Sequence, residues 1–155
     1  MARRDTDEFV TPATGGGDVG EINAILGFHI RLAYGAVYRH FTETFSDLDL
    51  TQKQVSVLWL VGDHPGIAQT DLARRLRMDR ATTMAIVNRL QSRSLLRRGP
   101  SQTDGRKQAL YLEEAGVATL DRAKAAVREH ERWLKARFTN REVDKLLELL
   151  TRIHE

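Results

Sequence analysis

The sequence predicts a mainly α-helical fold of about six helices, interrupted once by a β-hairpin of two or three short strands. Two observations carry this prediction. Apolar residues recur at helical spacing through most of the chain from residue 21 onward, and the turn sequence GPSQTDG at residues 99–105 separates two strand-like segments. At 155 residues, the chain is long enough for one well-cored domain, or for a subunit that completes its core by pairing with a second copy.

The N-terminal third predicts an arm followed by one long helix. Residues 1–19 contain Thr-Pro, three consecutive glycines and alternating charges, so they are expected to form a disordered or loosely docked arm. An amphipathic helix is then expected from Glu21 to about Phe45. Residues 20–48 are assigned to this helix.

Three shorter helices are predicted next. Thr51 is the expected N-cap of a helix that stops at 62–66, and Thr70 that of a short helix ending near Met78. Asp79 is expected to cap a third helix, which buries Ile86, Val87 and Leu90. Two helices joined by a turn of three or four residues form a helix-turn-helix.

The hairpin directly follows this helix-turn-helix. Leu95 to Arg98 and Lys107 to Leu112 are predicted to be its strands, and basic residues stand on both sides of its turn. A hairpin in this position is a wing, so residues 49–114 are assigned to a winged helix-turn-helix lobe. In such a lobe the second helix enters the major groove of DNA, and an arginine at the hairpin tip can reach a minor groove.

The charge distribution agrees with a polyanionic partner. The net charge is only +3, but residues 51–110 contain 11 Lys/Arg against 4 Asp/Glu, a net charge of +7. Phosphate contacts release counterions and strengthen binding to such a surface. A solvated basic face remains the alternative interpretation.

Two closing helices are predicted after Gly116, from Val117 to about Phe138 and from Arg141 to Glu155, with Thr139 or Asn140 as the cap of the second. The last helix has an apolar stripe: Val143, Leu146, Leu147, Leu150 and Ile153. Residues 20–48 and 115–155 are therefore expected to form a dimerisation region, and a twofold pair would place two recognition helices one DNA turn apart on a palindrome. A three-helix core within one chain is the alternative.

Several functional classes find no support in the sequence. There is no cysteine, hence no disulfide or thiolate metal site, and no apolar run long enough to span a bilayer. No secretory signal is recognisable, so a cytoplasmic protein is expected. No phosphate-binding loop, nucleophile elbow or dinucleotide fingerprint occurs, so neither an enzyme nor a cofactor is expected.

The order of these elements resembles the MarR family of bacterial winged helix-turn-helix regulators, over residues 21–155. The most specific match is Asp104-Gly105-Arg106, which fits the family's D-x-R wing signature. The resemblance implies that Asp104 braces the wing by pairing with an arginine, and that Arg106 contacts the minor groove. Two positions depart from the family pattern: Ser94 replaces a glycine after the recognition helix, and Glu113 replaces a threonine that caps the next helix.

The candidate DNA-binding residues lie in the helix-turn-helix and the wing. Asn88 is expected to read an adenine edge and Arg80 a guanine edge. The basic cluster of Arg74, Arg75 and Arg77 is expected to contact the DNA backbone. The full set is Arg74, Arg75, Arg77, Arg80, Thr82, Thr83, Met84, Asn88, Arg98, Asp104, Arg106 and Lys107.

A second candidate site comes from the aromatic and cationic residues of the first long helix. The resemblance implies a small ligand, often a phenolic compound or aromatic carboxylate, and it extends to members that respond to aromatic acids or their CoA thioesters. Arginines suit the carboxylate or phosphate of such a ligand. The candidates are Phe28, His29, Arg31, Tyr34, Tyr38, Arg39 and Trp59, each with a place in the dimer core as the alternative.

The predicted function is a ligand-responsive transcriptional regulator, a repressor that binds a palindromic operator as a homodimer and is released by an aromatic acid, a phenolic compound or an aromatic acyl-CoA. One alternative is a winged-helix module that binds DNA without sequence preference, or a protein partner, and responds to no small molecule. A weaker one is a metal-responsive regulator that uses Asp63, His64 and His130, although these residues lack ligand spacing.

Overall fold

The structure is a computed structural model that describes residues 18–155. The described chain divides between His40 and Phe41 into two compact units, and the second unit is Phe41–Glu155. The helix that begins the fold runs across this boundary. Except for Asp18 and Val19, the predicted N-terminal arm lies outside the described residues.

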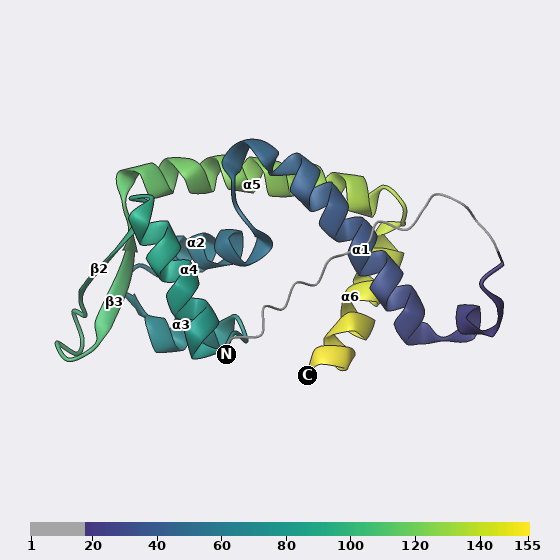
Figure 1. Cartoon of the computed structure of the whole chain (residues 1–155), viewed down its shortest axis with the longest axis horizontal. Helices are drawn as coiled ribbons and strands as arrows, with labels where there is room; N and C mark the ends of the chain where they lie inside the picture. The colour runs from purple at the N-terminus through teal and green to yellow at the C-terminus, as the bar shows by residue number, and fades with distance from the viewer. Residues whose placement is uncertain (1–17) are drawn as a thin grey trace, which may run out of the picture. The chain divides into compact units, whose positions relative to one another are not determined.

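Six α-helices and three short strands make up the described chain (Figure 1). The helices are α1 (Leu26–Thr44), α2 (Gln52–Asp63), α3 (Gln69–Arg75), α4 (Arg80–Ser92), α5 (Glu114–Lys135) and α6 (Asn140–His154). The strands are β1 (Ile67–Ala68), β2 (Leu96–Pro100) and β3 (Gln108–Leu112), and two 3-10 turns, η1 (Gly20–Ala24) and η2 (Ser46–Leu48), flank α1. The prediction of a mainly α fold of about six helices with a small β wing is confirmed.

The helix caps explain where most of these helices begin. Thr51 and Thr139 each form a capping box, in which the threonine hydroxyl accepts from a backbone N–H and a Gln or Glu side chain accepts from the threonine N–H. Asp79 caps α4 through its carboxylate. The prediction that Thr70 caps a helix is wrong: α3 begins at Gln69, so Thr70 lies inside the helix, and the N-cap Ala68 provides no side-chain cap.

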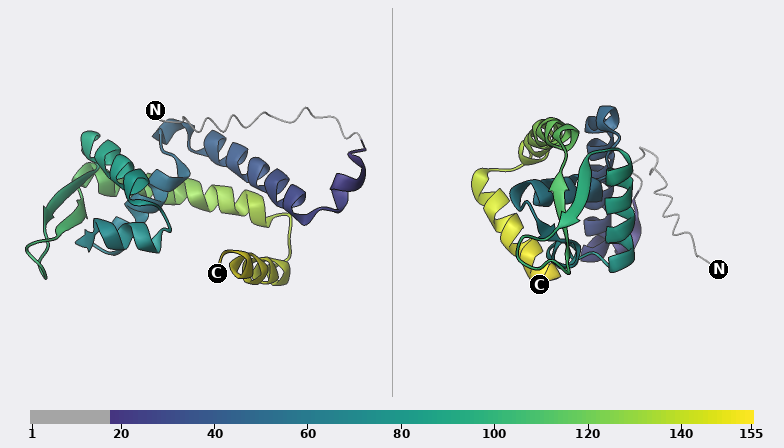
Figure 2. Two further views of the ribbon diagram at one scale, coloured as in Figure 1. Left: turned by 60° about the horizontal axis from the view of Figure 1, so that its bottom comes forward. Right: turned by 90° about the vertical axis from the view of Figure 1, so that its left-hand side faces the viewer.

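The three strands form an antiparallel sheet in the order β1-β3-β2 (Figure 2). Leu110 occupies the centre of the sheet, because it pairs with Ile67 on one side and with Arg98 on the other. In both figures the β2–β3 hairpin projects beyond the helices of its unit, as a wing does.

The core of the second unit lies where its helices cover the sheet. Leu58, Leu72, Leu90 and Leu110, from four different elements, are fully buried and belong to one apolar cluster. Burial of a leucine side chain stabilises a fold by roughly 1.5–3 kcal/mol. The wing and the helix-turn-helix therefore share one core, which fixes their relative positions.

Three residues of this unit that carry a side chain lie in the left-handed region, where glycine is favoured, and one of them is Asp49 after η2, with φ of 48°. Arg77, after α3, has φ of 52°, and Ser94, after α4, has φ of 57°. After α4, Leu95 N–H donates to Leu90 O at 3.0 Å and Ser94 N–H to Gln91 O at 2.9 Å, which is the hydrogen-bond pattern of a Schellman motif. Ser94 occupies the position of this motif where glycine is most common.

Replacing Ser94 by glycine is expected to raise the free energy of unfolding by about 0.5–1 kcal/mol, because glycine adopts a positive φ without steric cost. Urea denaturation followed by circular dichroism measures the change. Ser92→Gly is the matched control: Ser92 is the last helical residue of α4, so glycine there is expected to lower stability by about 0.5 kcal/mol. A loss of stability in Ser94→Gly would show that the turn is not strained.

Candidate DNA-binding surface

The helix-turn-helix consists of α3 and α4, joined by four residues from Leu76 to Asp79. Asp79 Oδ1 accepts from the Thr82 N–H at 2.7 Å, and Oδ2 accepts from the Thr82 hydroxyl at 2.7 Å. These hydrogen bonds, with the backbone N–H of Thr82 contributing most, lower the pKa of Asp79 below its usual value. The cap therefore keeps its charge at neutral pH and holds the first turn of α4.

The solvent-facing side of α4 carries most of the side chains predicted to meet DNA. Arg80, Met84 and Asn88 are exposed, and Met84 is 51% exposed even though it is apolar. An exposed methionine on this face offers apolar contact rather than core packing. Val87 and Leu90 are fully buried on the opposite side, as predicted, whereas Ile86 is only partly buried.

Thr83 is a correction to the predicted surface. Its side chain is completely buried, and its hydroxyl donates to the carbonyl of Asp79 at 2.8 Å. The residue therefore anchors the first turn of α4 from the core side and has no atom on the face that Met84 exposes. Thr82 and Thr83 are neighbours in α4, but Thr83 is buried whereas Thr82 is partly exposed.

The three arginines of the basic cluster have different partners. Arg74 pairs with Asp71 at 3.6 Å, and both side chains are largely exposed. Arg75 Nη1 lies 3.3 Å from His64 Nε2. Arg77 donates to the carbonyl of His154 at the end of α6, and its Nη1 is 3.2 Å from His154 Nδ1. Arg74 is thus exposed at the surface, whereas Arg77 links the turn of the helix-turn-helix to the C-terminal helix.

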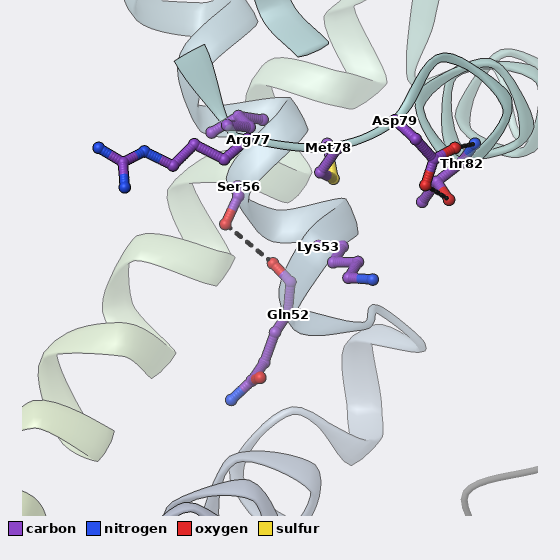
Figure 3. A pocket seen from close by; sticks show the side chains of 8 residues that line it. Gln52, Lys53, Ser56, Arg77, Met78, Asp79 and Thr82 are labelled. Atoms are coloured by element: carbon purple, nitrogen blue, oxygen red, sulfur yellow. Dashed lines mark hydrogen bonds between the residues drawn. The ribbon is translucent and has the colours of Figure 1, made fainter. Parts of the chain in front are cut away.

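A pocket of about 260 Å³ lies between the start of α2 and this turn (Figure 3). In the figure, the side chains of Gln52, Lys53 and Arg77 point in three different directions, while Asp79 and Thr82 contact each other. The Ser56 hydroxyl donates to the Gln52 carbonyl at 3.1 Å. Since the polar groups do not converge on the space, the pocket does not have the arrangement of a small-molecule site.

The tip of the wing is exposed to solvent. Asp104, Arg106 and Lys107 are exposed, and Asp104 Oδ1 accepts from the backbone N–H of Arg106 at 3.1 Å. This contact shapes the turn locally. Among residues 18–155, the ion pairs do not include Asp104, so the bracing of the wing by an Asp104–arginine pair is not the contact seen.

Arg98 lies between the wing and the recognition helix rather than at the tip. Its guanidinium donates to Asn88 Oδ1 at 2.8 Å, to Gln69 Oε1 at 3.2 Å and to Gln91 Oε1. One side chain of β2 therefore binds three amide groups, from α3 and from two turns of α4. Sequence reasoning missed Gln69 and Gln91, because no pattern along the chain connects these positions with residue 98.

The aromatic and cationic candidates of α1 form local pairs. The Phe28 and His29 rings meet edge to face at 5.5 Å, and Arg31 lies over the Phe28 ring at 5.4 Å. The Tyr34 and Tyr38 rings are 6.1 Å apart. Arg39, also on α1, is exposed. The helix thus carries both aromatic rings and arginines along its length.

Trp59 and the suggested metal ligands belong to the second unit. Lys124 lies over the Trp59 ring at 5.1 Å. His130 is buried between the rings of Phe41 and Trp133, at 5.8 and 5.7 Å. Within residues 18–155, no three His, Asp or Glu side chains come together as metal ligands would.

A helix-turn-helix with a basic hairpin beside it defines this chain as a winged-helix DNA-binding protein. The sequence model of the MarR family matches residues 48–107. A putative regulatory protein for the hcr operon of Thauera aromatica is 31% identical over 136 residues, 87% of this chain and 82% of the relative. The chain belongs to the MarR family.

Solved structures extend the comparison to the whole fold. The repressor CouR bound to a 23-mer DNA duplex superimposes with a TM-score of 0.83 at 33% identity, over 91% of this chain and all of CouR. CouR bound to p-coumaroyl-CoA gives a TM-score of 0.80 at 34% identity, over 88% of this chain and 96% of that one. Family and fold are those of DNA-binding transcriptional regulators rather than of enzymes. None of the helices in residues 18–155 has the length and apolar character needed to cross a bilayer.

Proposed function

We propose that the protein is a repressor that binds a palindromic operator as a homodimer and is released by an aromatic acid, a phenolic compound or an aromatic acyl-CoA. The observation that carries the DNA-binding part is the exposed face of α4, flanked by a wing whose tip presents Arg106 and Lys107. The net charge of +7 over residues 51–110 favours association with a polyanion.

The candidate DNA contacts fall into two groups. Arg80, Met84 and Asn88 would face the base edges, and Arg74, Arg75, Arg106 and Lys107 the phosphates or the minor groove. Thr82 would lie beside the backbone at the start of α4. Asp104 would act through the shape of the wing turn, by holding the Arg106 N–H.

Two observations support the proposed ligand class: the residues of α1, and the ligand bound by a protein of similar structure. Phe28, Tyr34 and Tyr38 offer aromatic faces, and His29, Arg31 and Arg39 offer groups that bind anions. CouR, at 34% identity, binds p-coumaroyl-CoA, which is an aromatic acyl-CoA. Trp59 on α2 remains a further candidate. Such a ligand would release DNA only through unequal affinity for the DNA-bound and free states.

The proposal is tested by fluorescence-anisotropy titration of the full-length protein. One duplex comes from the region upstream of its own gene and the other has the same bases scrambled, each at several salt concentrations. We expect tight binding to the first duplex alone. A panel of aromatic acids and their CoA thioesters, p-coumaroyl-CoA among them, is then added, and we expect one of these compounds to abolish the binding. Equal, steeply salt-dependent binding to both duplexes would instead support the module that binds DNA without sequence preference.

Arg106→Ala is expected to weaken binding to both duplexes alike and to reduce the slope of log K against log salt by about 1, because its charge acts at the wing without reading bases in the major groove. The same titrations measure this. Asn88→Ala is the comparison variant: it is expected to lose about 1–3 kcal/mol of discrimination between the duplexes. If Asn88→Ala weakens both duplexes equally, Asn88 does not read a base.

A further inference from the structure

We propose that Arg98 is a positioning residue that turns the amide NH2 group of Asn88 toward the major groove, so that Asn88 reads a guanine rather than an adenine. This inference rests on the proposed function, because it concerns how the operator is read. It also revises the expectation from sequence, in which Asn88 paired with adenine.

The orientation of the Asn88 amide follows from the chemistry of its partner. A guanidinium group has five N–H donors and no acceptor, so the amide atom that faces Arg98 must be the oxygen. The 2.8 Å distance from Arg98 Nη2 to Asn88 Oδ1 is that of a good hydrogen bond. Nδ2, with its two hydrogens, is therefore on the side away from Arg98.

Arg98 is held firmly enough to impose this orientation. It lies opposite Leu110, which is fully buried in the centre of the sheet, and its side chain is only partly exposed. Its guanidinium also donates to Gln69 at 3.2 Å and to Gln91. Three hydrogen bonds to three amides leave the guanidinium little freedom to turn away from Asn88.

The base preference follows from the groups that each base presents in the major groove. Guanine presents two acceptors, N7 and O6, which match an amide that offers only N–H donors. Adenine presents one acceptor and one donor, so a bidentate contact would need Oδ1, which is turned to Arg98. Gln91 lies one turn beyond Asn88, and its oxygen also faces Arg98, so it too presents donors.

The test is a binding selection with the full-length protein on a library of duplexes with randomised bases, followed by sequencing of the bound fraction. Comparison with Asn88→Ala identifies the position in each half-site whose base preference depends on Asn88. At this position we expect the unaltered protein to prefer guanine. In Arg98→Ala, the preference for guanine over adenine at that position is expected to fall roughly tenfold, because the amide is free to flip.

Asn88→Asp is the matched variant, since it keeps an oxygen for Arg98 and has the same size but no NH2 group. Its preference is expected to switch from guanine to cytosine, whose amino group donates to a carboxylate. In the double variant Arg98→Ala/Asn88→Ala, the base preference is expected to equal that of Asn88→Ala alone. A general loss of stability would not produce this position-specific pattern, and circular dichroism and urea midpoints check each variant.

Three outcomes would count against the inference. The inference is overturned if the unaltered protein prefers adenine at the Asn88-dependent position, or if a folded Arg98→Ala keeps its guanine preference unchanged. Neither result contradicts the proposed function as a transcriptional regulator. If Arg98→Ala does not fold, the inference is overturned instead by an Asn88→Asp variant that still prefers guanine at that position. Failure of the unaltered protein to select any sequence from the library contradicts the proposed function itself.

Discussion

Replacing Gly116 by alanine is expected to lower the free energy of unfolding by about 3 kcal/mol, at the upper end of what overpacking costs. A Cβ atom at this position would lie 1.8 Å from the carbonyl oxygen of Leu95 and 2.8 Å from its carbonyl carbon. Both are backbone atoms, so no side chain can rotate to make room. Either α5 or the start of β2 must move.

The reason for this close approach is a hydrogen bond between the same two segments. The Glu113 N–H donates to the Leu95 carbonyl at 3.0 Å, and this contact holds the beginning of α5 against the beginning of β2. Leu95 and Gly116 are both buried. The alanine methyl would therefore separate α5 from the wing lobe, and Leu120, which packs into the core one turn further along α5, would lose contacts.

Urea denaturation at a fixed protein concentration measures the change, since association of subunits would otherwise alter the apparent stability. Gly105→Ala is the control. Gly105 lies in the wing turn, where an added Cβ meets nothing within 4 Å, and its effect is expected to stay within about 0.5 kcal/mol. Equal stability of Gly116→Ala and the unaltered protein would mean that α5 can shift freely along β2.

The sequence predicted the helices best where a local signal marks their first turn. Thr51 and Asp79 were expected as N-caps, and Thr139 was one of two candidates beside Asn140. Each of the three accepts a hydrogen bond from the backbone three residues later. Thr70 offered the same residue type, but β1 places Ile67 and Ala68 in the sheet, so the chain enters α3 before Thr70. A two-residue strand has no pattern of its own, because it exists only through pairing with β3.

The candidate site was predictable only where it depends on one element. The exposed face of α4 follows from its period, which places Met84 and Asn88 on one side. The contacts of Arg98 depend on strand register and on three amides from two helices, and Thr83 is buried although Thr82 is only partly so. These properties arise from tertiary packing, so the spacing of residues in a single sequence does not reveal them.

Leu147→Glu is expected to convert the proposed homodimer into a monomer and to reduce its affinity for a palindromic duplex by about a hundredfold or more. The reason lies in α6, none of whose residues is buried in the single chain. Leu147 is 59% exposed and Ile153 62% exposed, on a stripe that Leu146 and Leu150 continue. An isolated exposed leucine is ordinary, whereas a row of them along one helix face indicates an interface.

The expected loss of affinity follows from the link between two half-sites. In a dimer, binding of one recognition helix holds the other near its half-site, and such coupling raises affinity by about 10²–10⁴ without any new contact. Sedimentation equilibrium measures the subunit state, and fluorescence anisotropy measures the affinity. Because the glutamate replaces a side chain that is already exposed, the fold of the single chain is expected to survive, as circular dichroism would verify.

Lys145→Glu provides the matched control, since it makes a larger change of charge on the opposite side of the same helix. Lys145 pairs with Glu148 at 2.8 Å, and an exposed pair of this kind contributes about 0.5 kcal/mol at most on a helix surface. This variant is expected to remain dimeric and to retain its affinity for the palindrome. A dimeric Leu147→Glu would place the interface elsewhere, whereas a folded monomer that has lost the palindrome but still binds scrambled DNA weakly would show that pairing through α6 supplies the specific affinity.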